Sequence, residues 1–356
     1  MKQKHPYVDL PDYSFWSRSV SRIPAEDIDP VVFSPKFIKK EHHIATAGSC
    51  FAQHLARRLK LIGYNYYVPE DISPIFGPSS ATDQGYRVFS ARYGNIYTVR
   101  QLLQLYKRAY GILVPEDDHW NTKQIYIDPL RPTVQPGGYI TLAELRRDRE
   151  YHLKCVREMF ENLDVFIFTL GLTESWINTV DGIVYPICPG VSDGVFNPKK
   201  HKFHNFTYEE IMADLREFVN LLRDVNPTSR IILTVSPVPL AATGEDRHVL
   251  VSTTYSKSVL RVVCDTIAQE YNDIHYFPSY EIITGQHAAG AYYTSNLREI
   301  SEIGVDHVMR VFNRHFLASS PDEVGSVVGV DDPAARIRRA SEAFVQVECD
   351  ERLLEG

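Results

Sequence analysis

The sequence predicts an α/β fold in which helices cover both faces of a parallel sheet. Three apolar runs, at 165–170 (VFIFTL), 231–235 (IILTV) and 274–277, are typical of strands that are buried on both faces. Helical patterns at about 208–223 and 256–271 separate these runs. Strands that alternate with helices favour a parallel sheet, and right-handed crossovers make it a doubly wound sandwich.

The first strand and helix of this fold come early in the chain. Residues 43–47 (HIATA) form a short, mainly apolar run that ends in Gly48, Ser49 and Cys50. Between 51 and 62 the apolar residues recur at the spacing of an amphipathic helix. The pattern therefore predicts a strand, a tight turn and a helix in direct succession.

The remaining segments are predicted to be an arm, two insertions and a tail. Residues 1–42 are rich in proline, aromatic and charged residues without a period, which indicates an extended arm that packs on the domain. The domain itself is expected over 43–317, with 111–150 and 186–204 as loop insertions. Long loops of this kind often form the walls of a binding site. Residues 318–356 are expected to form a linker and a peripheral C-terminal helix.

Composition and charge exclude several classes of function. With 356 residues, 44% of them hydrophobic, the chain can bury a sizeable core. Its net charge of -7 gives no overall positive field for a phosphate backbone, so no nucleic-acid partner is expected. No stretch approaches the roughly 18 uncharged apolar residues of a membrane helix, and the N-terminus lacks the apolar region of a secretory signal. We expect a cytoplasmic protein without a membrane span, and the sequence does not indicate its oligomeric state.

The cysteines and histidines predict neither a disulfide framework nor a metal site. The five cysteines are odd in number, far apart and never arranged as CxxC or CxxH. The 13 histidines are spread along the chain, which is a weak signal for metal binding. A metal ion or a cofactor is therefore not expected.

The turn after the first strand is the first candidate for chemistry, because ligands of open α/β sheets bind beyond the carboxyl ends of the strands. Gly48 permits a sharp turn, and a nucleophile in the first turn of the next helix lies near N–H groups that can hold an oxyanion. A thiol in that position, here Cys50, gains thiolate character. The alternative interpretation is that Cys50 is a small buried hydrophobe and Ser49 only caps the helix.

Three further polar segments are candidates. In the segment 93–95 (YGN), Gly94 can bring its N–H close to a ligand and the Asn95 amide can donate to an oxygen. A turn before a helix explains the same pattern. Glu174 follows the 165–170 strand, where it can orient a base or accept a ligand hydroxyl. Ser236 follows the 231–235 strand, and Lys257 near the start of the next helix can meet an anion or be solvated.

Together these segments resemble the bacterial GSCFA-domain family over about residues 5–316. The resemblance depends on five motifs: GSCFA at 48–52, YGNIYT at 93–98, GLTESW at 171–176, TVSPVPL at 234–240 and YSKSVLR at 255–261. That family looks like a branch of the SGNH (GDSL-type) esterase and acetyltransferase superfamily. The resemblance implies a three-layer α/β/α sandwich with a parallel sheet of about five strands.

The resemblance also implies roles for individual residues. Gly48 and Ser49 take the places of the superfamily's Gly and Asp, and Cys50 takes the place of its nucleophilic serine. The superfamily's Asn-Asp pair in the third block is replaced here by Thr173 and Glu174. The implied oxyanion set is Gly94, Asn95, Gly171 and Thr173.

The superfamily's last block, Asp-x-x-His, corresponds here to 296–299 (NLRE), so the usual His and its acid are missing. A base must then come from one of the candidates His54, Glu174, His287, Glu299 and His307. His54 has the best local geometry, because residues i and i+4 share a helix face, although it also fits a structural role on that helix. A thiol needs less help from a base than a hydroxyl does.

We expect an acyl-transfer enzyme, either an esterase or an O-acyltransferase, that acts on a carbohydrate or a similar polar acyl ester. The nucleophile is Cys50, or Ser49 if Cys50 packs inward; the carbohydrate is inferred by analogy with the superfamily. The alternative is a non-catalytic carbohydrate-binding or scaffold protein that kept the fold. The expected substrate-binding residues are Gly48, Trp176, Ser236, Lys257, His287 and His307.

Overall fold

The computed structural model describes residues 5–72, 84–122, 124–318 and 353–354. Contacts divide the described residues into two compact units, one within 40–276 and the other formed by 5–39 with 277–318. The predicted C-terminal helix lies outside the described residues. No helix in the described ranges is long and apolar enough to cross a membrane.

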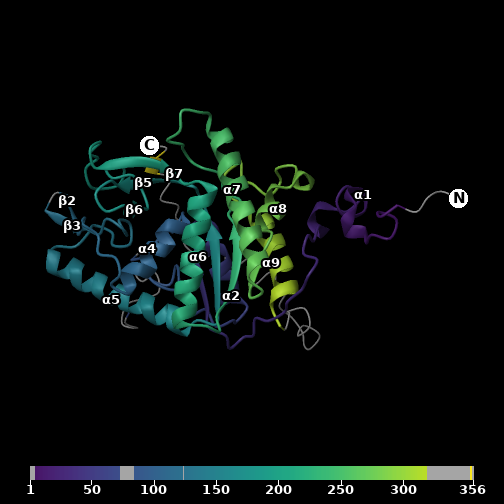
Figure 1. Ribbon diagram of the computed structural model, residues 1–356, viewed down its shortest axis with the longest axis horizontal. Helices are drawn as coiled ribbons and strands as arrows, with labels where there is room; N and C mark the ends of the chain where they lie inside the picture. Colours follow the sequence, from purple (N-terminus) through teal and green to yellow (C-terminus); the bar gives the residue numbers. More distant parts are fainter. Residues whose placement is uncertain (1–4, 73–83, 123, 319–352, 355–356) are drawn as a thin grey trace. The chain divides into compact units, whose positions relative to one another are not determined.

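The first unit is built on a parallel sheet with the strand order β1-β4-β8-β9 (Figure 1). The strands are β1 (Ile44–Ala47), β4 (Val165–Leu170), β8 (Arg230–Val235) and β9 (Ile274–Tyr276). Every residue of β4 is buried, as expected for a strand that is covered on both faces. The predicted parallel sheet is therefore confirmed, and it has four strands in the described part of the chain where about five were expected.

Helices flank this sheet and complete the α/β fold that the sequence predicts (Figure 1). They are α2 (Cys50–Leu61), α4 (Val99–Ala109), α5 (Leu142–Asn162), α6 (Tyr208–Val225) and α7 (Val249–Glu270). α2 contacts β1 and β4, whereas α7 contacts β8 and β9. Capping boxes at Thr98, Thr141 and Thr207 start α4, α5 and α6, because each threonine accepts from a backbone N–H three residues on.

Aromatic side chains join three of these helices to the sheet. The ring of Phe160 on α5 lies 5.9 Å from Phe166 on β4 and 5.7 Å from Phe218 on α6, measured between centroids. Tyr106 on α4 lies 5.4 Å from Phe160. These offset and edge-on contacts are the arrangements that aromatic rings favour, and they fix α4, α5 and α6 against the sheet.

Parts of the segments that were predicted as loops are regular structure. The 111–150 insertion contains the hairpin of β2 (Trp120–Thr122) and β3 (Ile125–Ile127), and α5 already begins at Leu142. A second, antiparallel sheet has the order β6-β5-β7 and is built from β5 (Glu174–Asn178), β6 (Val184–Tyr185) and β7 (His201–Asn205). Strands of two to five residues are too short to produce a periodic signal.

The second unit joins the N-terminal arm to the last helices of the described chain. Its helical elements are η1 (Asp12–Ser14), α1 (Trp16–Ser19), η2 (Ala25–Asp27), α8 (Ser279–Thr284), η3 (Gln286–Ala288) and α9 (Glu302–Phe316). Ile38 forms a parallel bridge with Leu317, and the His315 ring contacts the Asp29 carboxylate at 2.7 Å. The arm is thus paired with the end of α9 inside this unit.

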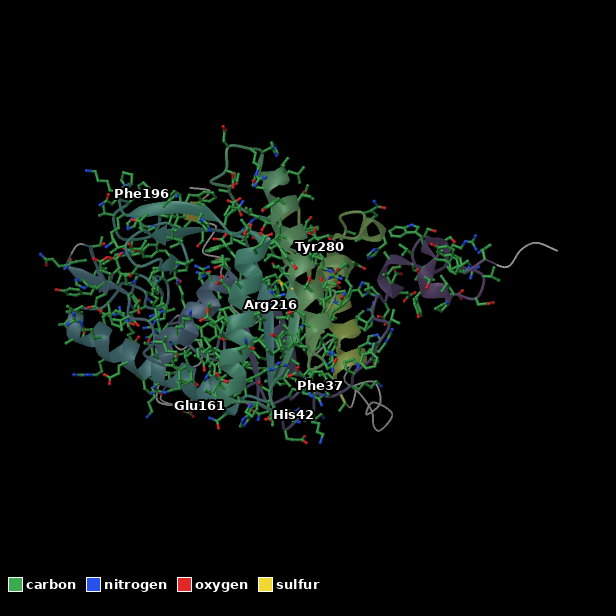
Figure 2. The ribbon with its side chains drawn as sticks, viewed as in Figure 1. Phe37, His42, Glu161, Phe196, Arg216 and Tyr280 are labelled. Carbon is green, nitrogen blue, oxygen red and sulfur yellow. The ribbon has the colours of Figure 1, made fainter. Side chains whose placement is uncertain are left out.

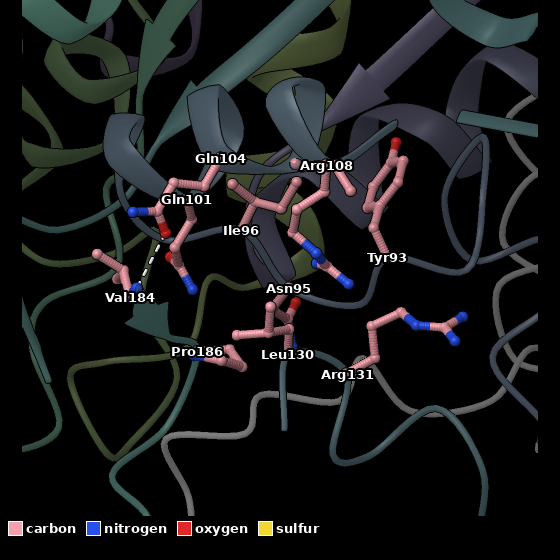
Figure 3. Close-up of a pocket in the computed structure, with 11 residues that line it drawn as sticks. Tyr93, Asn95, Ile96, Gln101, Gln104, Arg108, Leu130, Arg131, Val184 and Pro186 are labelled. Atoms are coloured by element: carbon pink, nitrogen blue, oxygen red, sulfur yellow. Dashed lines mark hydrogen bonds between the residues drawn. The ribbon is translucent and has the colours of Figure 1, made fainter. Parts of the chain in front are cut away.

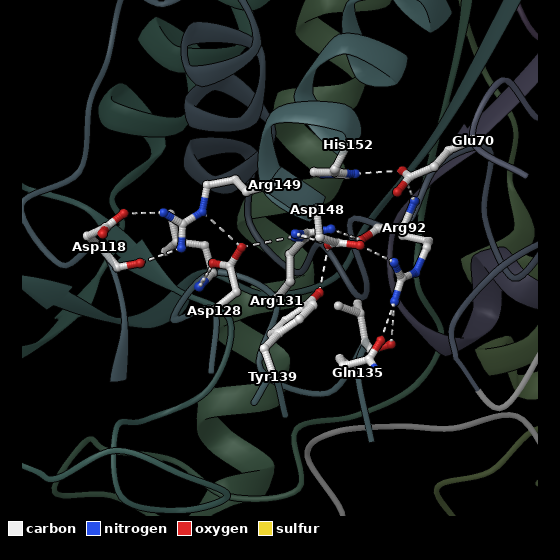
Figure 4. A network of polar contacts seen from close by, with 12 residues as sticks. Glu70, Arg92, Asp118, Asp128, Arg131, Gln135, Tyr139, Asp148, Arg149 and His152 are labelled. Carbon is white, nitrogen blue, oxygen red and sulfur yellow. Dashed lines mark hydrogen bonds and ion pairs between the residues drawn. The ribbon is translucent and has the colours of Figure 1, made fainter. Parts of the chain in front are cut away.

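A buried network of ion pairs holds the 111–150 segment inside the first unit (Figure 4). Arg131 donates to Asp128 at 3.2 Å and to Asp148 at 2.8 Å. Asp148 also accepts from Arg92 at 2.7 Å, and Asp128 accepts from Arg149 at 3.1 Å. Each of the two carboxylates is therefore shared by two guanidinium groups, which compensates the cost of its burial.

This network predicts a stability that falls in acid. Burial alone would raise the pKa of Asp128, but Arg131 and Arg149 hold it well below its usual range. A depressed folded-state pKa stabilises the protein above the unfolded value and loses that contribution as the pH falls through it. We expect the free energy of unfolding to drop between about pH 5 and pH 2, and to drop less steeply in Asp128→Asn. Urea unfolding across this range measures both slopes. Glu209→Gln, at an exposed position, is the control, and equal slopes for Asp128→Asn and the wild type would contradict the assignment.

Candidate active site

The turn between β1 and α2 packs directly on the neighbouring strand. Gly48 has a φ of +146°, and a Cβ there would lie 2.8 Å from both the Cβ and the carbonyl oxygen of Thr169 on β4. Only glycine fits such a contact without moving the strand. Ser49 is the N-cap of α2 but makes no capping bond with its side chain, and Cys50 is the first residue of the helix.

The two candidate nucleophiles are both largely buried. Cys50 is 8% exposed and Ser49 is 4% exposed. Cys50 is a thiol rather than half of a disulfide. The Ser49 hydroxyl lies toward Gly171, 3.7 Å from where a Cβ on that glycine would be. Both side chains therefore lie inside the edge of the sheet.

The segment 93–98 (YGNIYT) lies against the turn between β1 and α2. The Ile96 N–H donates to the Gly48 carbonyl at 2.8 Å. Gln53 on α2 donates to the Asn95 side-chain oxygen at 3.2 Å, which turns the Asn95 NH₂ group away from Gln53. Gly94, with a φ of +70°, makes the bend that places Asn95 there. The structure thus brings Gly94 and Asn95 beside Cys50's helix.

The segment 171–176 (GLTESW) is held by main-chain hydrogen bonds and by a side chain of α7. The N–H groups of Gly171 and Leu172 both donate to the Tyr97 carbonyl, at 3.1 and 2.9 Å, so the Gly171 N–H is already used. Lys257 is 1% exposed, and its Nζ donates to the Gly171 carbonyl at 2.6 Å. Lys257 therefore stabilises the loop that follows β4. The sequence had predicted an anion or solvent as its partner, not a main-chain carbonyl.

Thr173 and Ser236 are buried at the same sheet edge. The Thr173 N–H donates to Ser256 Oγ on α7 at 3.1 Å, while Thr173 Oγ1 is buried and has no hydrogen-bond partner among the described residues. The Ser236 N–H donates to the Leu170 carbonyl at 2.9 Å, and its hydroxyl accepts from the Val238 N–H at 3.3 Å. Ser236 thus shapes the turn that follows β8.

Glu174 and Trp176 belong to β5 of the small sheet. The Glu174 carboxylate accepts from Thr243 Oγ1 at 2.8 Å and from the Gly244 N–H at 3.1 Å. Burial raises the pKa of Glu174, against the effect of these two bonds. The Trp176 ring packs edge-on to Phe196 and Phe203, with centroids 5.3 and 5.8 Å away. Glu174 is therefore rigidly held, and Trp176 is part of an aromatic cluster.

The GSCFA family model matches residues 43–312. The chain belongs to the GSCFA family. No curated protein matches it. Among solved structures it is similar to an acetyl xylan esterase, Est2A, from the rumen bacterium Butyrivibrio proteoclasticus, with 13% sequence identity and a TM-score of 0.24. The similarity covers 70% of this chain and 56% of that one, so the chain spans little more than half the length of that structure.

His54 is the one histidine on α2 of this GSCFA-family chain. Burial, together with the charges of Arg57 and Arg58, lowers the pKa of His54 to about 3. The imidazole is therefore neutral near pH 7 and holds a proton only weakly, which makes it a poor general base.

The other three base candidates lie in the second unit and are engaged there. One ring nitrogen of His287 bonds the Ile282 carbonyl at 3.1 Å. Both ring nitrogens of His307 are used, one by the Tyr292 hydroxyl and one by the Ile28 carbonyl, each at 2.8 Å. The Glu299 N–H donates to the Asn296 side chain at 2.9 Å, so the NLRE stretch forms a turn closed by Asn296.

Three residues that support the candidate site, within the family motifs or close to them, were not predicted. Gln53 lies three residues after Cys50, on the same side of the helix. This spacing could have identified it as a residue of the site. Ser256 lies within the YSKSVLR motif itself. Thr243 had no signal, because its partner Glu174 is 69 residues away in the sequence.

A small cavity lies beside Asn95 (Figure 3). Its empty volume is about 380 Å³, which includes its opening. Its walls come from the second motif, from α4 and from the two segments predicted as insertions, which contribute Leu130, Arg131 and Pro186. The cavity is therefore adjacent to the proposed oxyanion residues.

Proposed function

We propose that this chain is an acyl-transfer enzyme, an esterase or O-acyltransferase, that acts in the cytoplasm on a carbohydrate or a similar polar acyl ester. The observation that supports it best is the position of Cys50. It is the first residue of α2, directly after a glycine turn at the carboxyl end of β1. This is the place in which the resembling SGNH superfamily carries its nucleophile.

The proposed reaction has two steps. The Cys50 thiolate attacks the ester carbonyl carbon, a C–S bond forms, and the C–O bond to the alcohol breaks as that alcohol takes up a proton. Water, or the hydroxyl of an acceptor, then attacks the thioester and the C–S bond breaks. The products are a carboxylic acid in hydrolysis or a new ester in transfer, and the thiolate is regenerated.

The oxyanion of each tetrahedral intermediate needs hydrogen-bond donors that are already in place. The proposed donors are the N–H groups of Cys50 and Gly94 and the NH₂ group of Asn95. The bond from Gln53 supports this role for Asn95, because it fixes the amide oxygen as an acceptor and so orients the whole side chain. Loss of one such donor costs about 10²- to 10³-fold in kcat.

Proton transfer is assigned to Glu174. Burial raises its pKa, which makes it a stronger base than an exposed carboxylate, and its bonds to Thr243 and Gly244 fix its position. His54 is the less suitable candidate, since its conjugate acid has a pKa of about 3.

The test is to trap the acyl-enzyme. The full chain is mixed with p-nitrophenyl acetate in a single turnover, quenched in acid and mapped by peptide mass spectrometry. We expect one acetyl group on the peptide that contains Cys50, the same adduct in Ser49→Ala, and none in Cys50→Ala. An adduct that persists in Cys50→Ala would exclude Cys50 as the nucleophile, and its loss in Ser49→Ala alone would assign the reaction to Ser49.

The second candidate function is a non-catalytic carbohydrate-binding protein. The low exposure of Cys50 and the absence of the Asp-x-x-His block favour it. Alkylation by iodoacetamide near pH 6 separates the two candidates, because an activated thiolate reacts much faster than a free-cysteine peptide. Equal rates would support the binding protein.

A further inference from the structure

Arg108 is a buried cation whose side chain makes no hydrogen bond to another described residue. It lies on α4 and is 7% exposed. Its Nε and Nη2 atoms are buried and have no hydrogen-bond partner in the described part of the chain, and no described carboxylate forms an ion pair with it. Burial lowers the pKa of Arg108 to about 10, and the charges of Arg131 and Arg149 act in the same direction, while Asp128 opposes them. It is therefore still a cation near pH 7.

The guanidinium reaches into the cavity beside Asn95 (Figure 3). None of the described residues that line this cavity is acidic. The second cation on its wall, Arg131, is already bonded to Asp128 and Asp148. Two glutamines of α4 on the wall are also engaged: Gln101 accepts from the Tyr97 N–H, and Gln104 bonds the backbone of the β6 segment. Arg108 is thus a cation of this lining whose hydrogen-bond donors meet no acceptor among the described residues, although its charge is felt by Asp128.

A buried guanidinium whose donors meet no acceptor is costly, so the position of Arg108 calls for a ligand that accepts its hydrogen bonds. We propose that this cavity binds a carboxylate group, with the Arg108 guanidinium as its counter-ion. The fork of donors on a guanidinium matches the two oxygens of a carboxylate. That the carboxylate belongs to the acyl substrate, for example to an acidic sugar, rests on the proposed function, whereas the binding itself does not.

The charge of the site favours a carboxylate over a phosphate. A carboxylate carries one negative charge, which a single guanidinium compensates. A phosphate group carries about 1.5 to 2 negative charges near pH 7, and the second cation on the wall, Arg131, is already bonded to Asp128 and Asp148.

The proposal is tested by isothermal titration of the full chain with glucuronate and with acetate. The matched neutral probe is the methyl ester of glucuronate (methyl glucuronate), which keeps the sugar but removes the charge of the carboxylate. Inorganic phosphate is titrated as a further probe. We expect glucuronate to bind at least about tenfold more tightly than methyl glucuronate and phosphate. Arg108→Met should lose this preference. Lys107→Met, which removes a charge from the same helix outside the cavity, should keep it.

Thermal unfolding of the variants provides a second readout. Because the Arg108 side chain has no hydrogen-bond partner among the described residues, Arg108→Met and Arg108→Gln should unfold at a temperature no lower than the wild type. Three outcomes would each overturn the proposal. Glucuronate and its methyl ester could bind equally, neither acetate nor glucuronate could bind, or both variants could fail to fold. Tighter binding of phosphate would overturn the choice of carboxylate. Titration of Cys50→Ala separates the two hypotheses, since loss of acyl transfer with intact carboxylate binding rejects only the proposed function.

Discussion

Cys50→Ala is expected to lower turnover of an activated acetyl ester by roughly 10³-fold or more, because it removes the atom that forms the covalent intermediate. The fold should be unaffected, since alanine fits the first turn of a helix at least as well as cysteine. Steady-state hydrolysis of p-nitrophenyl acetate measures the effect, with circular dichroism to verify the fold.

Two further cysteine variants sharpen this prediction. Cys50→Ser should also be nearly inactive, because a hydroxyl depends on a general base and the only histidine on α2 is a weak one. Cys188→Ala is the matched control: it removes another partly buried thiol, whose pKa burial raises to about 11, and should leave turnover unchanged. Activity retained in Cys50→Ala would reject the covalent mechanism.

Arg92→Met is expected to lower the free energy of unfolding by about 3–5 kcal/mol, because it breaks a buried ion pair and leaves the partner charge behind. The Arg92 guanidinium donates to Asp148 at 2.7 Å, to the Gln84 carbonyl at 2.8 Å and to the Val134 carbonyl at 3.0 Å (Figure 4). Arg92→Lys should recover only part of the loss, since an ammonium cannot reach all of these acceptors in one geometry. Urea unfolding at neutral pH measures each difference.

The matched control is an arginine in an exposed ion pair. Arg216 on α6 lies at the surface and donates to Glu270 at 2.9 Å (Figure 2). Exposed pairs contribute little because water screens them, so Arg216→Ala should change the free energy of unfolding far less than Arg92→Met. Similar losses for the two variants would show that the buried network does not stabilise the fold as described.

The sheet and most of its helices could be predicted from local patterns. β4 and β8 are continuous apolar runs, and both were expected within one residue of their observed bounds. α2 and α6 follow the apolar spacing of their sequences in the same way. α7 begins at Val249 rather than near 256, because its first turns carry serines and threonines that weaken the helical pattern.

The site was predictable where it depends on chain order and not where it depends on distant partners. Motifs that follow parallel strands must meet at one edge of the sheet, which placed the turns at Gly48, Gly171 and Ser236 together. The partner of Lys257 is a main-chain carbonyl 86 residues away, and no side-chain pattern encodes it. The unbonded donors of Arg108 likewise become visible only when its surroundings are known.

The loops at the edge of the sheet are fastened to one another through peptide groups: Ile96 to Gly48, Gly171 to Tyr97 and Ser236 to Leu170. Such links do not depend on which side chain each position carries. Residues that face a bound molecule can therefore be exchanged while the scaffold stays in register, so selection for a new specificity can proceed through single substitutions without rebuilding the backbone.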